Sequence, residues 1–125
     1  MYMIQFTIHD NPPSVNGFWG HCARGKYITA KGRTWREHIR SYTEELIKDG
    51  VIAPFNENAR LSVKYEFHFK GKRKRDTGNY EKPLTDTFEG LLFENDECID
   101  HIELDRYYNA EFDHTDILIF EIAAV

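Results

Sequence analysis

The sequence predicts an α+β fold in which helices pack on one face of a mixed β-sheet. Some stretches alternate apolar and polar residues, which is the period of a strand, whereas others repeat apolar residues every three or four positions, which is the period of a helix. These stretches follow one another in the order β-α-β-α-β-β. No internal repeat or linker separates them, so we expect a single domain over residues 1–125.

The first predicted strand and the first predicted helix are separated by a loop. Residues 2–8 alternate as a strand, and a proline pair ends it because proline lacks a backbone donor and fixes φ. Residues 15–27, rich in glycine and aromatic residues, predict an irregular loop. Thr29 can then cap a helix that stops near Gly50. Its apolar positions lie on one face: Trp35, Ile39, Tyr42 and Leu46.

The most regular strand pattern covers residues 61–69. Apolar and polar residues alternate there without exception, which predicts a central strand buried on one face. This strand would deliver the residues that follow it to the rim of a site. Its buried residues are expected to be Leu61, Val63, Tyr65, Phe67 and Phe69.

The remaining elements are a second helix and two strands. Residues 79–92 return to helical spacing, and Pro83 requires the helix to start close to Asn79. The residues expected on its apolar face are Tyr80, Leu84, Phe88 and Leu91. Apolar residues at 102–108 suggest a third strand, and the almost continuous apolar run at 117–122 predicts a buried fourth.

Composition restricts the functions that this chain can have. A hydrophobic content of 41%, with 14% aromatic residues, is typical of a folded protein. The net charge of −5 excludes a generally basic nucleic-acid coat, so nucleic-acid binding would need a local patch. Two cysteines are too few for a disulfide framework and favour a reduced compartment. No apolar stretch predicts a membrane span, and we expect a soluble, intracellular protein.

The densest charge pattern lies between residues 70 and 105. A basic run, KGKRKR, leads directly into Asp76, and several acids follow: Asp86, Glu89, Asp96, Glu97 and Asp100. Basic side chains can hold a polyanion while carboxylates hold a divalent cation, an arrangement suited to work on a phosphodiester. On composition alone the run is most often solvated surface. Its candidate DNA-binding residues are Lys70, Lys72, Arg73, Lys74 and Arg75.

Several segments resemble the RusA-type Holliday junction resolvases, which are small endonucleases of bacteria, phages and prophages. The similar segments are PPSVNGFW (residues 12–19), RGKYITAKGRTWREHI (24–39) and KRDTGNYEKPLTDTFEGLLFENDECID (74–100). Their order and spacing cover nearly the whole chain. The resemblance therefore implies a RusA-like fold as well as a nuclease site.

The resemblance also implies roles for particular residues. Asp76 matches the family's first acid, Asn79 its asparagine and Lys82 its lysine. Asp96 matches the later acid if one residue is missing near the end of the helix, and Glu97 matches it otherwise. The implied catalytic residues are Asp76, Lys82 and Asp96, with Asp76 and Asp96 as ligands of Mg²⁺ or Mn²⁺. We expect these two carboxylates to share a cation, because the helix between them can return the chain to the same end of the sheet.

Gly78 departs from the family pattern, which has a second acid at this position. Three interpretations are open. Another acid (Asp86, Asp100 or Glu97) supplies the missing oxygen, the protein is a weak or inactive nuclease, or the glycine replaces the aspartate of a normal motif in an altered sequence.

Together these observations predict a divalent-metal-dependent endonuclease that cleaves branched DNA in recombination and repair. A homodimer is expected because resolving a four-way junction needs two symmetric cuts. The alternative is a RusA-like module that binds DNA or another partner but has lost catalysis through Gly78. No phosphate-binding loop or dinucleotide motif is present, so no nucleotide cofactor is expected.

Overall fold

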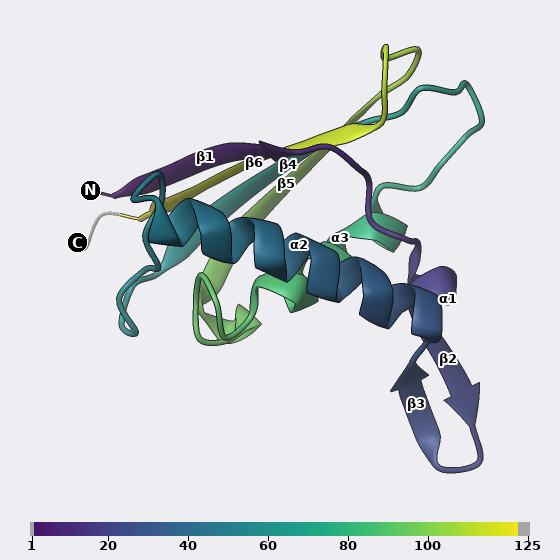
Figure 1. Ribbon diagram of the computed structural model, residues 1–125, viewed down its shortest axis with the longest axis horizontal. Coiled ribbons are helices and arrows are strands. Elements are labelled where there is room, and N and C mark those ends of the chain that lie inside the picture. Colours follow the sequence, from purple (N-terminus) through teal and green to yellow (C-terminus); the bar gives the residue numbers. More distant parts are fainter. Residues whose placement is uncertain (1, 123–125) are drawn as a thin grey trace.

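A computed structural model, which describes residues 2–122, contains a four-stranded sheet in the order β1-β6-β4-β5 (Figure 1). The strands are β1 (Met3–Ile8), β4 (Leu61–His68), β5 (Ile99–Tyr107) and β6 (His114–Glu121). β4 and β5 are parallel, whereas β6 is antiparallel to both of its neighbours. The predicted mixed sheet is therefore confirmed, with β4 between two other strands as expected.

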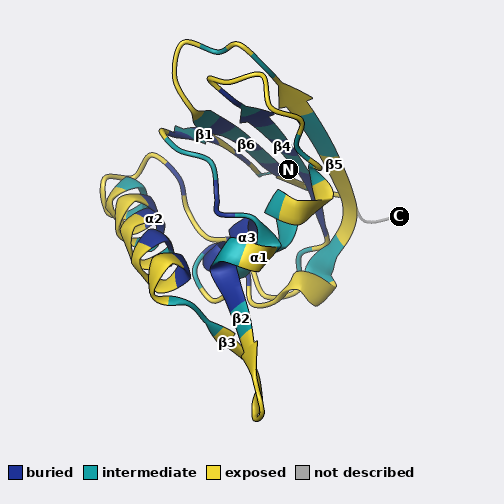
Figure 2. Ribbon diagram, turned by 90° about the vertical axis from the view of Figure 1, so that its right-hand side faces the viewer, coloured by how far each residue is buried: buried dark blue, intermediate teal, exposed yellow. Residues whose placement is uncertain are grey.

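The helices α1 (Val15–Phe18), α2 (Ala30–Lys48) and α3 (Gly78–Phe88) lie on one side of this sheet (Figure 2). The side chain of Thr29 accepts a hydrogen bond from the backbone N–H of Gly32, which confirms the predicted cap of α2. At the other end of α2, Gly50 has a φ of 75°, a conformation that ends the helix. None of the helices described is long and apolar enough to cross a membrane.

The core lies between the helices and one face of the sheet. The five predicted residues of β4 and its extension are all buried, so this prediction is confirmed. β1 and β6 contribute further buried residues: Ile4, Phe6, Ile8, Thr115, Ile117 and Ile119. The expected full burial of residues 117–122 is wrong, because Leu118 is only half-buried and Phe120 is exposed. These two side chains point to the sheet face that carries no helix.

Two other expectations need correction. Residues 15–27 are not an irregular loop: α1 leads into an antiparallel hairpin of β2 (Trp19–Cys22) and β3 (Gly25–Ile28), which projects away from the sheet (Figure 1). α3 ends at Phe88 instead of Leu92, because Gly90 adopts a φ of 77° and the next residues form a turn.

Candidate active site

The basic run begins where β4 ends, and backbone hydrogen bonds anchor its first residues. The Phe69 N–H donates to the Tyr107 carbonyl at 2.9 Å, and the Asn109 N–H donates to the Gly71 carbonyl at 3.3 Å. The Lys70 N–H donates to Asp113 Oδ1 at 2.8 Å. The run therefore leaves the sheet in a direction fixed by the connection between β5 and β6.

Arg75 is the most firmly held residue of the basic run. Its guanidinium lies 4.3 Å from the centre of the Phe69 ring, which is a cation–π contact. The backbone N–H of Arg75 donates a hydrogen bond to the Tyr108 hydroxyl. Lys72, Arg73 and Lys74 are exposed, and their side chains form no ion pair with any residue in the described range 2–122. These cations are therefore available to an external anion.

A hollow of about 320 Å³ adjoins the basic run. Lys31 of α2 and Arg73 and Arg75 of the basic run line it, together with the proline loop and the side chains of Trp35 and Tyr80. Two acids also line it, and both already accept hydrogen bonds: Asp10 from the Trp35 indole and from a backbone N–H, and Asp113 from the Lys70 N–H. The hollow thus combines free positive charge with aromatic surface.

Asp76 lies immediately before α3. Its Oδ1 accepts a hydrogen bond from the Gly78 N–H at 3.0 Å, so the carboxylate sits at the positive end of the helix. A Cβ on Gly78 would meet only this same Oδ1, at 3.4 Å. Position 78 can therefore carry a side chain, and a carboxylate there would adjoin that of Asp76.

Lys82 and Asp96 form the central contact of the candidate site. Lys82 Nζ donates to Asp96 Oδ2 at 2.8 Å, and both side chains are about half exposed. This hydrogen bond raises the pKa of Lys82 above its ordinary value. The structure therefore pairs Lys82 with Asp96 of the turn η1 (Asp96–Cys98), and not with Asp86 one turn further along α3.

Glu89 supports this contact from the end of α3. Its Oε1 accepts a hydrogen bond from the Asp96 N–H at 3.2 Å. Partial burial raises the pKa of Glu89, and the negative charges of Asp86 and Asp96 raise it further. The charge pattern of the sequence includes Glu89 among its acids but predicts no role for it. Its spacing of seven residues from Lys82, two helical turns, was the signal that could have identified it.

Arg60 holds the other two acids of this region. Its guanidinium contacts Glu97 Oε2 at 3.0 Å and also donates to the Asp100 carboxylate, which lowers the pKa of Asp100. Glu97 and Asp100 are therefore already neutralised by an arginine, whereas Asp96 faces Lys82. The sequence carried no signal for Arg60, because it lies 37 positions from Glu97.

The connection between Asp76 and Asp96 differs from the expectation. Because β4 and β5 are parallel, α3 runs back along the sheet to the end at which both strands begin (Figure 1). The expected return to the same end is wrong. Asp76 precedes the helix and Asp96 follows it, and the turn folds back along the helix far enough for Asp96 to reach Lys82.

The donor atoms suit a hard divalent ion, since those around Lys82 and Asp76 are carboxylate oxygens. Within residues 2–122, however, no group of three ligand atoms within 4.8 Å includes Asp76 or Asp96. The open position at Gly78 is where the family pattern would add another oxygen. Asp76, Lys82 and Asp96 as catalytic residues, and the two acids as ligands, therefore stay predictions.

Comparison with known proteins places the chain in a family. The sequence profile of a family described as Endodeoxyribonuclease RusA matches residues 10–119, which include every candidate residue of the site. No curated protein matches the chain significantly. Since the matched region covers most of the 125 residues, this chain belongs to the RusA endodeoxyribonuclease family, whose members generally resolve Holliday junctions.

Proposed function

We propose that this protein is a divalent-metal-dependent endonuclease that cuts branched DNA, with four-way junctions as its substrate. The contact between Lys82 and Asp96 supports this proposal most strongly, because it gathers a cation and several carboxylates at one point of the fold. The same residues match the family's active-site region. An ordinary surface ion pair needs only one acid, whereas Lys82 has Glu89 and Asp86 nearby in addition to Asp96.

In this proposal the phosphate backbone of DNA lies along the basic run and over the hollow lined by Lys31, Arg73 and Arg75. These contacts position the duplex without reading its bases. Lys82 then lies where it can stabilise negative charge on the phosphate that is attacked. Asp96 orients the Lys82 ammonium through their hydrogen bond, and Glu89 orients the backbone of Asp96.

Asp76 and Asp96 are the proposed ligands of a Mg²⁺ or Mn²⁺ ion, with Asp86 as the acid that makes up for Gly78. A bound ion would lower the pKa of a water molecule and neutralise charge on the phosphate. We prefer Asp86 over Glu97 and Asp100, because both of those acids already form ion pairs with Arg60. We further propose a homodimer in the cytoplasm, since two related cuts need two equivalent sites.

A module that binds junctions without cutting them is the second candidate. Two observations favour it: position 78 has no side chain, and the ammonium of Lys82 already neutralises Asp96. Losing one member of a cooperative catalytic set can cost several orders of magnitude in rate. Metal-dependent cleavage distinguishes the two candidates.

The test is cleavage of a synthetic four-way junction by the parent chain, Gly78→Asp and Gly78→Ala, with Mg²⁺, with Mn²⁺ and with chelator. We expect Gly78→Asp to cut at least about tenfold faster than the parent, a change of about 1.4 kcal/mol in the barrier. Gly78→Ala should match the parent, which separates the carboxylate from stiffening of the backbone. Efficient cutting by the parent with no gain in Gly78→Asp would mean that another acid fills the role, with Asp86 and Asp100 as the first candidates. Binding without cutting in every variant and metal would establish the binding module.

A further inference from the structure

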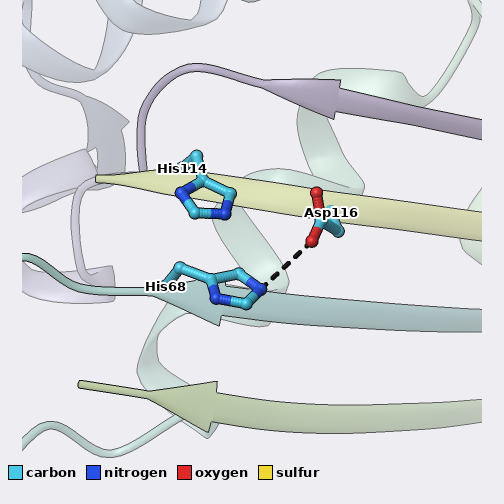
Figure 3. A group of neighbouring side chains, drawn as sticks. All are labelled: His68, His114 and Asp116. Atoms are coloured by element: carbon cyan, nitrogen blue, oxygen red, sulfur yellow. Dashed lines mark ion pairs between the residues drawn. The ribbon is translucent and has the colours of Figure 1, made fainter. Parts of the chain in front are cut away.

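The sheet face that carries no helix holds a second group of metal-binding side chains. His68 on β4 and His114 on β6 are directly paired across the two strands. Asp116 lies two residues beyond His114, so it points to the same face of the sheet. Figure 3 shows the two imidazole rings side by side, with Asp116 next to them on β6.

We propose that His68, His114 and Asp116 form a binding site for a transition-metal ion of the Zn²⁺ type. One ligand atom from each of the three residues lies within 4.8 Å of the other two, and no other such group of three occurs in the described part of the chain. His68 Nε2 and Asp116 Oδ2 are 3.1 Å apart. In a tetrahedral zinc site with bonds of about 2.0–2.2 Å the donor atoms lie about 3.3–3.6 Å apart, so these two atoms would only need to separate by a few tenths of an ångström.

Neighbouring groups leave one donor atom free on each residue. His114 Nδ1 lies 3.0 Å from the Phe112 carbonyl, so this nitrogen carries the proton and Nε2 keeps its lone pair. The Thr7 hydroxyl donates to Asp116 Oδ1 at 2.6 Å, which fixes the carboxylate and leaves Oδ2 toward His68. This arrangement matches the supporting hydrogen bonds that metal ligands receive in proteins.

His68 supplies the most direct sign of a missing partner. Its Nε2 is buried, yet within residues 2–122 it makes no hydrogen bond, since the nearby Asp116 oxygen lies off the required direction. An unsatisfied buried nitrogen costs stability. A metal ion between His68 Nε2 and Asp116 Oδ2 would satisfy both atoms.

Ion binding requires one change in the side chains. The rings of His68 and His114 are stacked at 4.1 Å with only 7° between their planes, so their in-plane lone pairs do not converge. His68 is held on its other side by the Tyr107 ring at 4.7 Å. His114 packs on its other side against the tilted Phe112 ring at 5.0 Å, and a rotation about its χ2, a torsion with broad minima, would turn its Nε2 toward the ion. The rotation must be small enough to keep the contact of His114 Nδ1 with the Phe112 carbonyl.

The chemistry separates this site from the acids around Lys82. Two imidazole nitrogens and one carboxylate favour Zn²⁺, Co²⁺ or Ni²⁺ over Mg²⁺, which prefers oxygen ligands. Three protein ligands would leave a fourth position open to water. Because His68 lies two residues before Lys70, the ion would join β4 to β6 at the base of the basic run.

The test is a calorimetric titration of metal-free protein with Zn²⁺ while Mg²⁺ is kept at a millimolar level to occupy the carboxylates around Lys82. We expect one high-affinity Zn²⁺ per chain. His114→Phe keeps a ring against His68 but removes the donor nitrogen, and Asp116→Asn removes the charge. Each should weaken Zn²⁺ binding at least tenfold. His101→Phe, on an exposed residue of β5 on the same sheet face, is the matched control and should bind like the parent.

Two measurements keep the test independent of folding defects in the variants. Co²⁺ added to the parent should give visible absorption bands of a four- or five-coordinate ion, and the nitrogen resonances of two histidines should shift on adding Zn²⁺. A ratio of about 100 between free Zn²⁺ and Kd should raise the Tm by at least about 5 °C. Equal Zn²⁺ affinity in the parent and His114→Phe would overturn the proposal. So would loss of that affinity in Asp96→Asn but not in His114→Phe.

Discussion

At the scale of single residues, position 78 determines how many anionic oxygens face the first turn of α3. A carboxylate there would adjoin Asp76, and two neighbouring negative charges repel each other unless a cation lies between them. Its effect on stability should therefore depend on the metal, and this dependence can be measured without any DNA.

We predict that Mg²⁺ raises the Tm of Gly78→Asp more than it raises the Tm of the parent. Without metal, Gly78→Asp should be no more stable than Gly78→Ala, because the added charge opposes that of Asp76. Differential scanning fluorimetry over a Mg²⁺ series measures both effects. An identical Mg²⁺ response in all three proteins would mean that position 78 does not face a cation site.

Lys82 is the residue for which we predict the largest catalytic effect. Lys82→Gln removes the ammonium that faces Asp96, and loss of such a group typically lowers kcat about 100-fold or more. Junction binding should change little, because the basic run is intact. Lys64→Gln is the matched control, since Lys64 also pairs with an acid, Glu103 at 3.4 Å, but on the sheet face without helices. Equal cleavage rates for the two variants would mean that Lys82 only forms a surface ion pair and has no catalytic role.

At the scale of elements, α2 depends on a close approach to α1. A Cβ on Gly32 would lie 2.5 Å from the Phe18 carbonyl oxygen, closer than atoms can pack without movement of the backbone. Helix propensity alone would favour alanine by about 1 kcal/mol. The steric cost of overpacking, about 1–3 kcal/mol, is the larger effect.

Gly32→Ala is therefore expected to lower the free energy of unfolding, measured by urea denaturation. Gly17→Ala is the control, because a Cβ there meets its nearest neighbour at an ordinary 3.6 Å. A stabilised Gly32→Ala would show that the helix has room to move away from Phe18.

The end of α3 should make stability depend on pH. The pKa of Glu89 is raised by burial and by Asp86 and Asp96, so the folded chain holds the proton more tightly than the unfolded chain. The free energy of unfolding then falls as pH rises from the ordinary value of 4.5 through the raised value. Glu89→Gln removes this loss of stability, because glutamine does not titrate, while its amide oxygen can still accept the hydrogen bond from the Asp96 backbone N–H.

We expect Glu89→Gln to be more stable than the parent near about pH 7 and similar to it near about pH 4, with a gain below about 1 kcal/mol because of solvent screening. Urea denaturation at the two pH values measures the difference. Glu94→Gln, an exposed residue on the same turn, is the control and should show no such dependence. A gain of equal size at both pH values would contradict this account.

The elements show where the sequence was sufficient. Strict alternation fixed β4, and Thr29 and Gly50 marked the ends of α2, because these signals are local. The hairpin of β2 and β3 was missed, since strands of four residues carry too few side chains to show a period. The end of α3 was also missed, because the apolar pattern continues beyond Gly90 into residues that the turn buries.

At the scale of the whole molecule, an acidic protein presents one local basic surface. We predict that replacing Arg73 and Lys74 by alanine weakens junction binding about equally for all sequences. The slope of log K against log salt should fall by about 0.9 for each phosphate that the variant no longer neutralises. Fluorescence anisotropy over a salt series measures both quantities. Unchanged binding at low and moderate salt would mean that the basic run is ordinary solvated surface and does not bind DNA.

The candidate site shows why sequence alone was not enough at this scale. The resemblance identified Lys82 and Asp96, and the structure brings them together. Other contacts could not be predicted from the sequence. Arg60 forms ion pairs with Glu97 and Asp100, and the pairing of β4 with β6 places His114 beside His68. Each depends on tertiary contacts between residues that are distant along the chain.

The position of β6 between β1 and β4 has a consequence for how the protein is made. β6 is the last strand within residues 2–122, and the hydrogen bond from Thr7 on β1 to Asp116 on β6 joins residues 109 positions apart. During synthesis, β1 must wait without a neighbouring strand until the residues of β6 have left the ribosome. High contact order of this kind slows folding and leaves strand edges exposed to aggregation. Nascent chains halted before residue 114 should therefore be digested readily by protease, whereas chains that include β6 should resist.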